Sequence, residues 1–246
     1  MKRQLRILAE RLTGTRIFRH LPVGIDEYVD VKSRFPRHEF ACFLDVGANI
    51  GQSALHIRQH FPRAEIHSLE PIASTFAQLV RNTRSAGIRA HQLALGASNG
   101  QVEARVEVNQ GHSDLNTLVN TERTEALSNS GEKSETVRVR TLESFCIDVG
   151  ISRIDFLKID TEGFDLEVLK GAGPWLGEQR IPLVLVEVSM NRTNTFHVAF
   201  DDVRRFMDER DYHIFGLYEQ THEWKTNKPL LRRANVLFVS GKMAGL

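Results

Sequence analysis

Two glycines follow a short apolar run near the start of the chain, and their spacing is typical of a site where backbone atoms contact a ligand. The run Phe40–Val46 predicts a strand, Gly47 and Gly51 predict a turn, and Gln52 begins a predicted helix. Glycine permits a sharp turn and close approach of a ligand to the backbone. The unpaired N–H groups at a helix start attract negatively charged groups. The segment therefore predicts a nucleotide or amino-acid ligand.

The spacing of these glycines separates two classes of nucleotide site. Asn49 lies where the dinucleotide fingerprint G-x-G-x-x-G requires its second glycine. Gln52 lies where a phosphate-binding P-loop requires lysine. A nicotinamide-dependent oxidoreductase is therefore the less favoured alternative.

An acidic residue follows the second predicted strand at a distance that suits a ribose. Glu70 comes 23 residues after Gly47, where a carboxylate accepts hydrogen bonds from ribose hydroxyls. Pro71 is expected at the first position of the next helix. The alternative is that Glu70 only favours the helix start through the helix dipole.

Three further acids are candidates for catalysis. Asp160 and Glu187 stand at or near the ends of two successive predicted strands, and Glu162 lies in the turn after the first of them. Ligands of open α/β sheets bind beyond the carboxyl ends of strands. A carboxylate there can act as a general base, and Asp160 is our first choice for that role. Asp160 and Glu187 could instead bind a divalent cation such as Mg²⁺, which we favour less because the acids are not clustered.

Two of the candidates have plain structural alternatives. Glu162 is equally well interpreted as a helix-start acid that accepts a backbone N–H. His112 lies in a polar stretch and could contact a substrate as a base or hydrogen-bond donor, but it could equally be a loop histidine without a role. His56 and His60 have the i, i+4 spacing of a zinc pair, but they lack the glutamate of His-Glu-x-x-His, so we expect them to pack or face solvent.

Seven short apolar runs separated by helical segments must position these residues. This alternation predicts an α/β fold, doubly wound and Rossmann-like, with helices on both faces of a mainly parallel sheet. The polar residues 218–234 between the last two runs predict a return into an antiparallel final strand. The runs are Phe40–Val46, Glu65–Leu69, Ile88–Leu95, Ile154–Ile159, Ile181–Val188, Tyr212–Leu217 and Asn235–Val239. The predicted helices are Gln52–His60, Pro71–Ala86, Phe164–Leu169 and Asp201–Glu209.

One domain accommodates most of the 246 residues. We expect an N-terminal helical segment over residues 1–38 and a domain over 39–246. Residues 101–140 combine two alternating runs with a long polar stretch, so they predict a β/loop insertion that could cover the mouth of the sheet.

Composition excludes several partners. A formal net charge of +1 gives no general attraction to nucleic acid, and no apolar run reaches the roughly 18 residues of a membrane span. Charged residues interrupt the first dozen positions, so we expect no signal peptide and a cytoplasmic location. Cys42 and Cys146 are expected to be buried, reduced thiols. The sequence leaves open whether the protein forms a homo-oligomer.

Two stretches together resemble a known family. Asp45–Gly51 followed by Glu70–Pro71 resembles the cofactor motifs of class I S-adenosylmethionine methyltransferases. Lys158–Gly163 with Val168–Gly171 further resembles the FkbM family, over roughly residues 40 to 190. The resemblance implies the sheet order 3-2-1-4-5-7-6 with strand 7 antiparallel.

The same resemblance implies roles for single residues. Its cofactor site takes in Asp45 and Pro71 of the two motifs; Gly47, Asn49 and Gly51 border the methionine part of the cofactor, and Glu70 binds the ribose. Ala94 and Leu95, at the end of the third predicted strand, lie beside the adenine.

The activity implied is methyl transfer from S-adenosyl-L-methionine to a hydroxyl of a small-molecule or carbohydrate acceptor, such as a sugar, glycolipid or secondary metabolite. An amine or carboxyl acceptor, a nicotinamide-dependent oxidoreductase and a non-catalytic nucleotide-binding protein are the alternatives.

Overall fold

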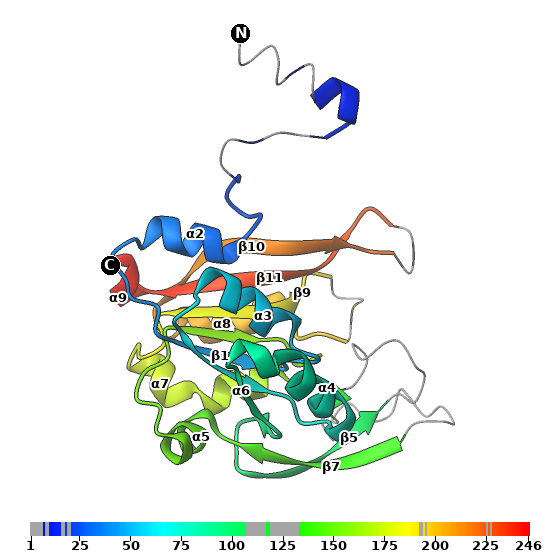
Figure 1. The fold of residues 1–246 in the computed structure, drawn as a ribbon, viewed down its shortest axis with the longest axis vertical. Helices are drawn as coiled ribbons and strands as arrows, with labels where there is room; N and C mark the ends of the chain where they lie inside the picture. Colours follow the sequence, from blue (N-terminus) through cyan, green and yellow to red (C-terminus); the bar gives the residue numbers. More distant parts are fainter. Residues whose placement is uncertain are drawn as a thin grey trace.

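The centre of the protein is a seven-stranded mixed sheet, shown in Figure 1 as a computed structural model. Only β11 runs antiparallel to its neighbours; the other paired strands of this sheet are parallel. This is the predicted order 3-2-1-4-5-7-6 with an antiparallel seventh strand, so the fold prediction is confirmed. From one edge to the other the strands are β3 (Arg89–His91), β2 (Glu65–Leu69), β1 (Cys42–Val46), β8 (Phe156–Ile159), β9 (Leu183–Ser189), β11 (Leu231–Ser240) and β10 (Tyr212–His222).

The structure describes residues 7, 10–15, 18, 21–106, 117–118, 133–191, 194, 196–224, 226 and 228–246. His112 and the middle of the predicted insertion lie outside these residues. Within the described parts of the chain, every helix is too short or too polar to span a bilayer.

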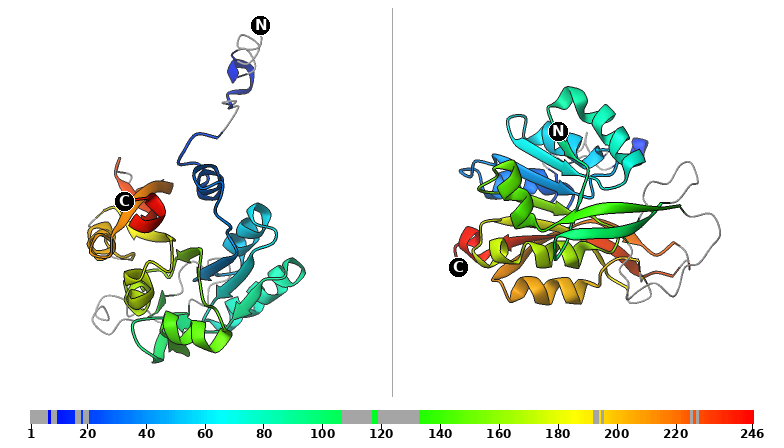
Figure 2. Two further views of the ribbon diagram at one scale, coloured as in Figure 1. Left: turned by 90° about the vertical axis from the view of Figure 1, so that its left-hand side faces the viewer. Right: turned by 90° about the horizontal axis from the view of Figure 1, so that it is seen from below.

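Helices cover both faces of the central sheet (Figure 2). Three of the four predicted helices are found within one or two residues of their expected bounds, and the fourth, α4, is followed by a short 3-10 turn at Arg84–Ala86. The helices are α2 (Glu27–Arg34), α3 (Gln52–His60), α4 (Ala73–Thr83), α5 (Leu142–Val149), α6 (Asp165–Gly171), α7 (Gly173–Gly177), α8 (Phe200–Asp208) and α9 (Gly241–Ala244).

Alternation of side chains along the strands divides the core in two. Leu183 and Leu185 of β9 join a cluster with Tyr28 of α2, whereas Val184 and Val186 join a second cluster on the opposite face. Because successive strand residues point to opposite faces, an uninterrupted apolar strand fills both cores at once. Cys42 and Cys146 are buried and unpaired, as expected.

The predicted third strand is wrong in one respect. Only Arg89–His91 pairs with β2, and the chain then turns, so that Ala94–Leu95 forms β4 in a separate small sheet. The carbonyl of His91 accepts hydrogen bonds from Glu70 N and Leu93 N, which closes this turn and ends the strand.

This second sheet contains the predicted insertion. It has the order β4–β7–β5–β6, in which β5 (Gly100–Val106), β6 (Thr117–Leu118) and β7 (Lys133–Arg140) come from the insertion. Ala104 and Val137 pack against Ile72, and Glu135 accepts a bond from Ala73 N. The insertion therefore docks at the start of α4, next to Glu70.

Candidate active site

Gly47 lies where β1 and β8 come closest at their carboxyl ends. Its N–H and that of Ala48 donate to the carbonyl of Leu69, at 3.0 and 2.9 Å. Its φ is +79°, and a Cβ at this position would lie 1.9 Å from the carbonyl oxygen of Asp160. Glycine is therefore required here by strand packing as well as by the left-handed conformation.

Gly51 closes the turn and begins α3. Its φ is +98°, and a Cβ would lie 2.7 Å from the Thr83 methyl group and 3.0 Å from Leu79 of α4. Asn49 between the two glycines also has a positive φ, of 48°. The absence of side chains at the two glycines thus lets the turn fit tightly between β8 and α4.

Glu70 joins this turn to the start of α4. One carboxylate oxygen accepts from Asn49 N at 3.2 Å and the other from Ile72 N at 3.0 Å. Burial raises the pKa of Glu70 to about 7 despite these two bonds. A carboxylate has about four acceptor positions, so Glu70 keeps acceptors for ribose hydroxyls. Pro71 lies before Ile72, the N-cap of α4, so its predicted place as the first helical residue is wrong.

Asp45 lies beneath the turn and is wholly buried. It accepts a hydrogen bond from Ser53 Oγ at 2.7 Å, which fixes the first turn of α3 to β1. Burial raises its pKa, and the charge of Lys158, whose Nζ lies 3.9 Å away, opposes this. Asp45 therefore supports the turn from within the core.

Asp160 directly follows β8, and its N–H donates to the carbonyl of Val46. Its carboxylate accepts a 2.9 Å bond from Lys158 Nζ. Burial by itself would raise the pKa of Asp160, but the ammonium of Lys158 outweighs it and the pKa lies below its ordinary value. Asp160 is thus an anion that accepts hydrogen bonds readily and takes up a proton poorly.

The turn after Asp160 directs Glu162 toward β9. Glu162 and Gly163 have φ values of 53° and 102°. The carboxylate of Asp165 fixes this conformation by accepting bonds from Thr161 N and Gly163 N, at 3.0 and 3.1 Å. The role of a helix-start acid, which the sequence left open for Glu162, therefore belongs to Asp165, and the Glu162 side chain meets a histidine instead.

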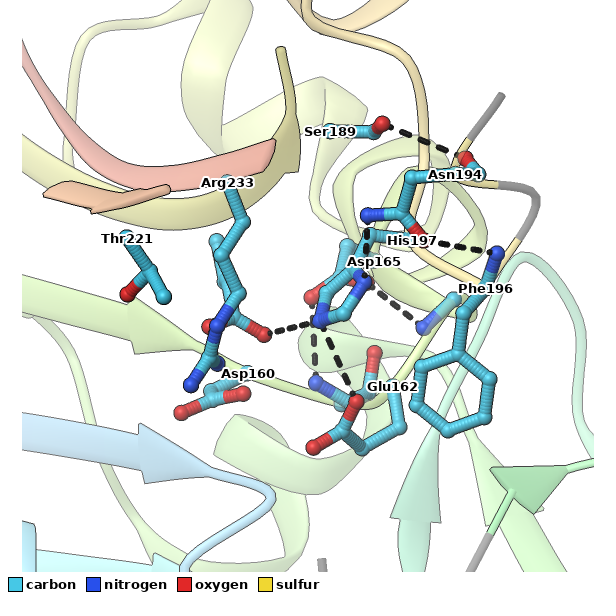
Figure 3. A network of polar contacts seen from close by, with 12 residues as sticks. Asp160, Glu162, Asp165, Ser189, Asn194, Phe196, His197, Thr221 and Arg233 are labelled. Carbon is cyan, nitrogen blue, oxygen red and sulfur yellow. Dashed lines mark hydrogen bonds and ion pairs between the residues drawn. The ribbon is translucent and has the colours of Figure 1, made fainter. Parts of the chain in front are cut away.

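That histidine is His197, which lies between two of the predicted acids (Figure 3). Its Nε2 is 2.7 Å from Glu187 and 3.3 Å from Glu162, and Arg233 of β11 pairs with the other Glu187 oxygen. Burial, then repulsion from Glu187 and other acids, raises the pKa of Glu162 to about 9. Glu162 is therefore protonated at neutral pH, whereas both oxygens of Glu187 have charged or polar neighbours.

Asn194 fixes the tautomer of His197. The amide oxygen of Asn194 accepts from Phe196 N and from Arg232, both at 3.2 Å, so its NH₂ group faces His197 Nδ1 at 3.1 Å. Nδ1 must then be the acceptor, and the ring proton lies on Nε2, toward the two glutamates. The Nε2–H group therefore lies within ion-pair distance of both glutamates.

A sequence model of the methyltransferase FkbM domain matches residues 45–214. This range contains the glycine turn, Glu70, Asp160, Glu162 and Glu187, and it is well over half of the chain. The chain belongs to the FkbM methyltransferase family. The resemblance drawn from the motifs is confirmed, and membership favours methyl transfer over the oxidoreductase alternative. Arg233 lies beyond the matched range.

Two curated relatives of this FkbM-family chain are methyltransferases by name. Methyltransferase 1 of Beauveria bassiana is 28% identical in an alignment of 167 residues that covers 63% of this chain and 66% of that protein. Methyltransferase sdnD of Sordaria araneosa is 30% identical in an alignment of 181 residues that covers 63% of this chain and 68% of that protein. The chain therefore spans about two thirds of the length of these relatives. Among solved structures, Aeropyrum pernix fibrillarin with natively bound S-adenosyl-L-methionine has a TM-score of 0.48 at 13% identity, covering 95% of this chain and 74% of that one.

The structure places Asp160, Glu162 and Glu187 close together at the carboxyl ends of β8 and β9. The sequence predicted this position for Asp160 and Glu187. Ala94 and Leu95 are buried in β4, not in the third strand of the main sheet, so their place beside an adenine stays a prediction. Sequence reasoning gave His197 no firm role and did not single out Arg233. The available signal for Arg233 was the pair of arginines, Arg232 and Arg233, just before the predicted final strand Asn235–Val239.

Three ligand atoms, from Glu162, Glu187 and His197, lie within 4.8 Å of one another. They do not fit Mg²⁺, which prefers oxygen ligands, because one is a nitrogen and the Arg233 guanidinium already pairs with Glu187. The geometry thus gives no support to the Mg²⁺ alternative at this cluster.

Proposed function

We propose that this FkbM-family chain transfers a methyl group from S-adenosyl-L-methionine to a hydroxyl oxygen of a sugar, glycolipid or secondary-metabolite acceptor. The main support for this proposal is a cluster of polar side chains beside the glycine turn, formed by Asp160, Glu162, Glu187 and His197. A sulfonium cofactor bound there supplies an electrophilic methyl group and leaves as a neutral thioether.

The chain's first task is to bind and orient this cofactor. Glu70 presents its remaining acceptor positions to the ribose hydroxyls, and the turn at Gly47–Gly51 presents backbone atoms to the methionine part. Orientation of two reactants contributes up to roughly 7–11 kcal/mol to lowering the barrier, more than proton transfer supplies.

Asp160 and Glu162 have different roles toward the acceptor hydroxyl because their pKa values are shifted in opposite directions. Asp160, with its lowered pKa, accepts a hydrogen bond from the hydroxyl and orients it. Glu162, with a pKa of about 9, is the better final proton acceptor once it is ionised. A cation bound beside Glu162 would lower the pKa of this carboxyl, so Glu162 would ionise more readily with a sulfonium cofactor in the site.

Polar groups around the acids favour a hydroxylated acceptor over an apolar one. The Arg233 side chain is 34% exposed, so its N–H donors are within reach of a ligand. The neighbouring Arg232 has its guanidinium over the half-exposed indole ring of Trp224. Hydrogen-bond donors beside an exposed ring suit the hydroxyls and apolar face of a sugar.

The test is transfer of labelled methyl from S-adenosyl-L-methionine to a panel of sugars, glycolipids and polyketide alcohols, with matched amines and carboxylic acids. We expect product only on hydroxyls, with equal rates in the presence and absence of a chelator. Label on amines or carboxyls would overturn the acceptor class. Binding of S-adenosylhomocysteine without transfer to any acceptor would favour a non-catalytic cofactor-binding protein.

A further inference from the structure

Three metal-ligating side chains meet at the far end of α3, away from the glycine turn that begins this helix. His56 and His60 lie one helical turn apart, and Asp26 approaches them from the N-cap of α2. The two histidine Nε2 atoms are 3.2 Å apart, and Asp26 Oδ2 lies 3.6 Å from His56 and 3.4 Å from His60.

We propose that Asp26, His56 and His60 bind a zinc ion that joins α2 to α3. Zinc bonds of about 2.0–2.1 Å in tetrahedral geometry place neighbouring ligand atoms roughly 3.3–3.4 Å apart. The three measured separations, 3.2, 3.4 and 3.6 Å, are close to the edges of such a tetrahedron. The His56 side chain is 43% exposed, so water can reach the fourth position.

The ligand types select zinc or a similar transition metal over Mg²⁺ or Ca²⁺. Two imidazole nitrogens and one carboxylate oxygen suit zinc, whereas the hard cations prefer oxygen alone. Histidines at i, i+4 on one helix face are a common zinc-binding pair. The glutamate that is missing from this pair acts as a general base in His-Glu-x-x-His and does not bind the metal, and Asp26, at the N-cap of α2, supplies a third ligand instead.

The site is preorganised on the carboxylate side. Asp26 Oδ1 accepts from Tyr28 N and Val29 N at 3.0 and 2.9 Å, which leaves Oδ2 directed at the imidazoles. The Tyr28 ring packs against both histidine rings, at centroid distances of 5.2 and 5.7 Å. Neither carboxylate nor rings need large movements to bind an ion.

One cation, the ammonium of Lys32, lies close to the site. Lys32 Nζ donates to the His60 carbonyl and lies over the Phe61 ring, so its hydrogen bond is made with the backbone and not with the ligand cluster.

The experiment uses the untagged full-length chain after treatment with a chelator. Titration with Zn²⁺ is followed by calorimetry, and titration with Co²⁺ by visible absorption, which reports tetrahedral coordination. We expect about one ion per chain, together with a rise in Tm because the ion binds only the folded state. Asp26→Asn, which retains the helix cap, and His56→Asn should each lose the tetrahedral Co²⁺ spectrum and the zinc-dependent rise in Tm.

Two matched controls make the result decisive. His213 pairs with Asp211 at 3.0 Å but belongs to no three-ligand group among the residues that the structure describes, so His213→Asn should leave the stoichiometry unchanged. His197→Asn removes the histidine of the cluster near β9 and should also leave the tetrahedral spectrum intact. Loss of the spectrum in His197→Asn with retention in His56→Asn, or no zinc binding by the wild-type chain, would overturn the proposal.

Discussion

Replacing Glu70 by glutamine tests the cofactor site at the residue that links its two halves. The carboxylate bonds Asn49 N and Ile72 N through different oxygens. An amide has only one oxygen, so one of the two N–H groups would face an NH₂ donor. Glu70→Gln also removes the negative charge that ribose hydroxyls would bind, while it preserves the size of the side chain.

The expected loss follows from the strength of a hydrogen bond to a charged group. Such bonds contribute about 1.5–3 kcal/mol, against roughly 0.5–1.5 for neutral ones. We therefore expect Glu70→Gln to weaken S-adenosylhomocysteine binding by about 1–2 kcal/mol, or roughly five- to thirtyfold in Kd. Glu70→Ala leaves both N–H groups unpaired and should lose about 1–3 kcal/mol.

The pH dependence of binding gives a sharper signature. With a pKa of about 7, Glu70 is mainly protonated at pH 6 in the free protein and ionised at pH 8. Ribose hydroxyls that donate to Glu70 favour its ionised form, so binding releases a proton and weakens as the pH falls through 7. The wild-type Kd should be roughly five- to tenfold higher at pH 6 than at pH 8, and this difference should vanish in Glu70→Gln.

Calorimetry with S-adenosylhomocysteine between pH 6 and pH 8 measures both effects. Glu135→Gln is the matched control, since Glu135 also accepts a backbone bond at the start of α4 but is only partly buried. Its binding should keep the pH dependence of the wild type, with a slightly lower midpoint because the charge of Glu135 contributes to the raised pKa of Glu70. A wild-type Kd in Glu70→Gln, or a pH dependence that persists in this variant, would refute the ribose role.

Three further predictions concern the turn and the acids. Gly47→Ala should lower the free energy of unfolding by about 2–5 kcal/mol, because its Cβ overlaps the Asp160 carbonyl. Gly87→Ala, where a Cβ meets nothing within 4 Å, should lose only about 1–2 kcal/mol in calorimetric melting, and equal losses would contradict the packing argument. Asp160→Asn should bind cofactor normally but lose about 10²-fold or more in kcat, and a near-normal kcat would remove Asp160 from the reaction. Glu162 ionises near pH 4.5 in the unfolded chain but keeps its proton up to about pH 9 in the folded protein, so its effect on stability becomes more unfavourable as the pH rises through this range. Glu162→Gln should therefore raise the Tm relative to wild type at pH 9 but not at pH 4.5, and the same difference in Tm at both pH values would contradict the raised pKa of Glu162.

Local patterns were sufficient to predict the sheet and most of its helices. Within the predicted run Ile181–Val188, the stretch Leu183–Val186 is continuously apolar and fills both cores, and this continuity indicated a buried parallel strand. Helix α5 was missed although Thr141 caps it by accepting from Ser144 N and Gly150 ends it in a left-handed conformation. These capping residues were the available signal, and the short, mixed sequence between them concealed it.

Contacts between distant segments could not be predicted in the same way. That Asp160 and Glu187 share an edge follows from parallel strand ends, which any doubly wound sheet brings together. The approach of Arg233 to Glu187 depends on the antiparallel register of β11 against β9, which places Arg233 opposite Ser189 and Asn235 opposite Glu187. His197 reaches the same place because Ser189 N bonds the carbonyl of Val198, folding the chain back over β9. No pattern in one sequence specifies either register.

The position of β11 determines the order in which the two sides of the central sheet can fold during synthesis. Among the described strands, β11 lies between β9 and β10, and β10 pairs with β11 alone, so the side of the sheet that carries Arg233 stays unassembled until β11 has left the ribosome. The part of the sheet that contains the glycine turn and Glu70, built from β1, β2 and α3, does not depend on pairing with β11. A nascent chain, or one that ends before β11, would therefore contain the glycine turn and Glu70 but lack Arg233. Such a chain could bind the proposed methyl donor before it could transfer the methyl group.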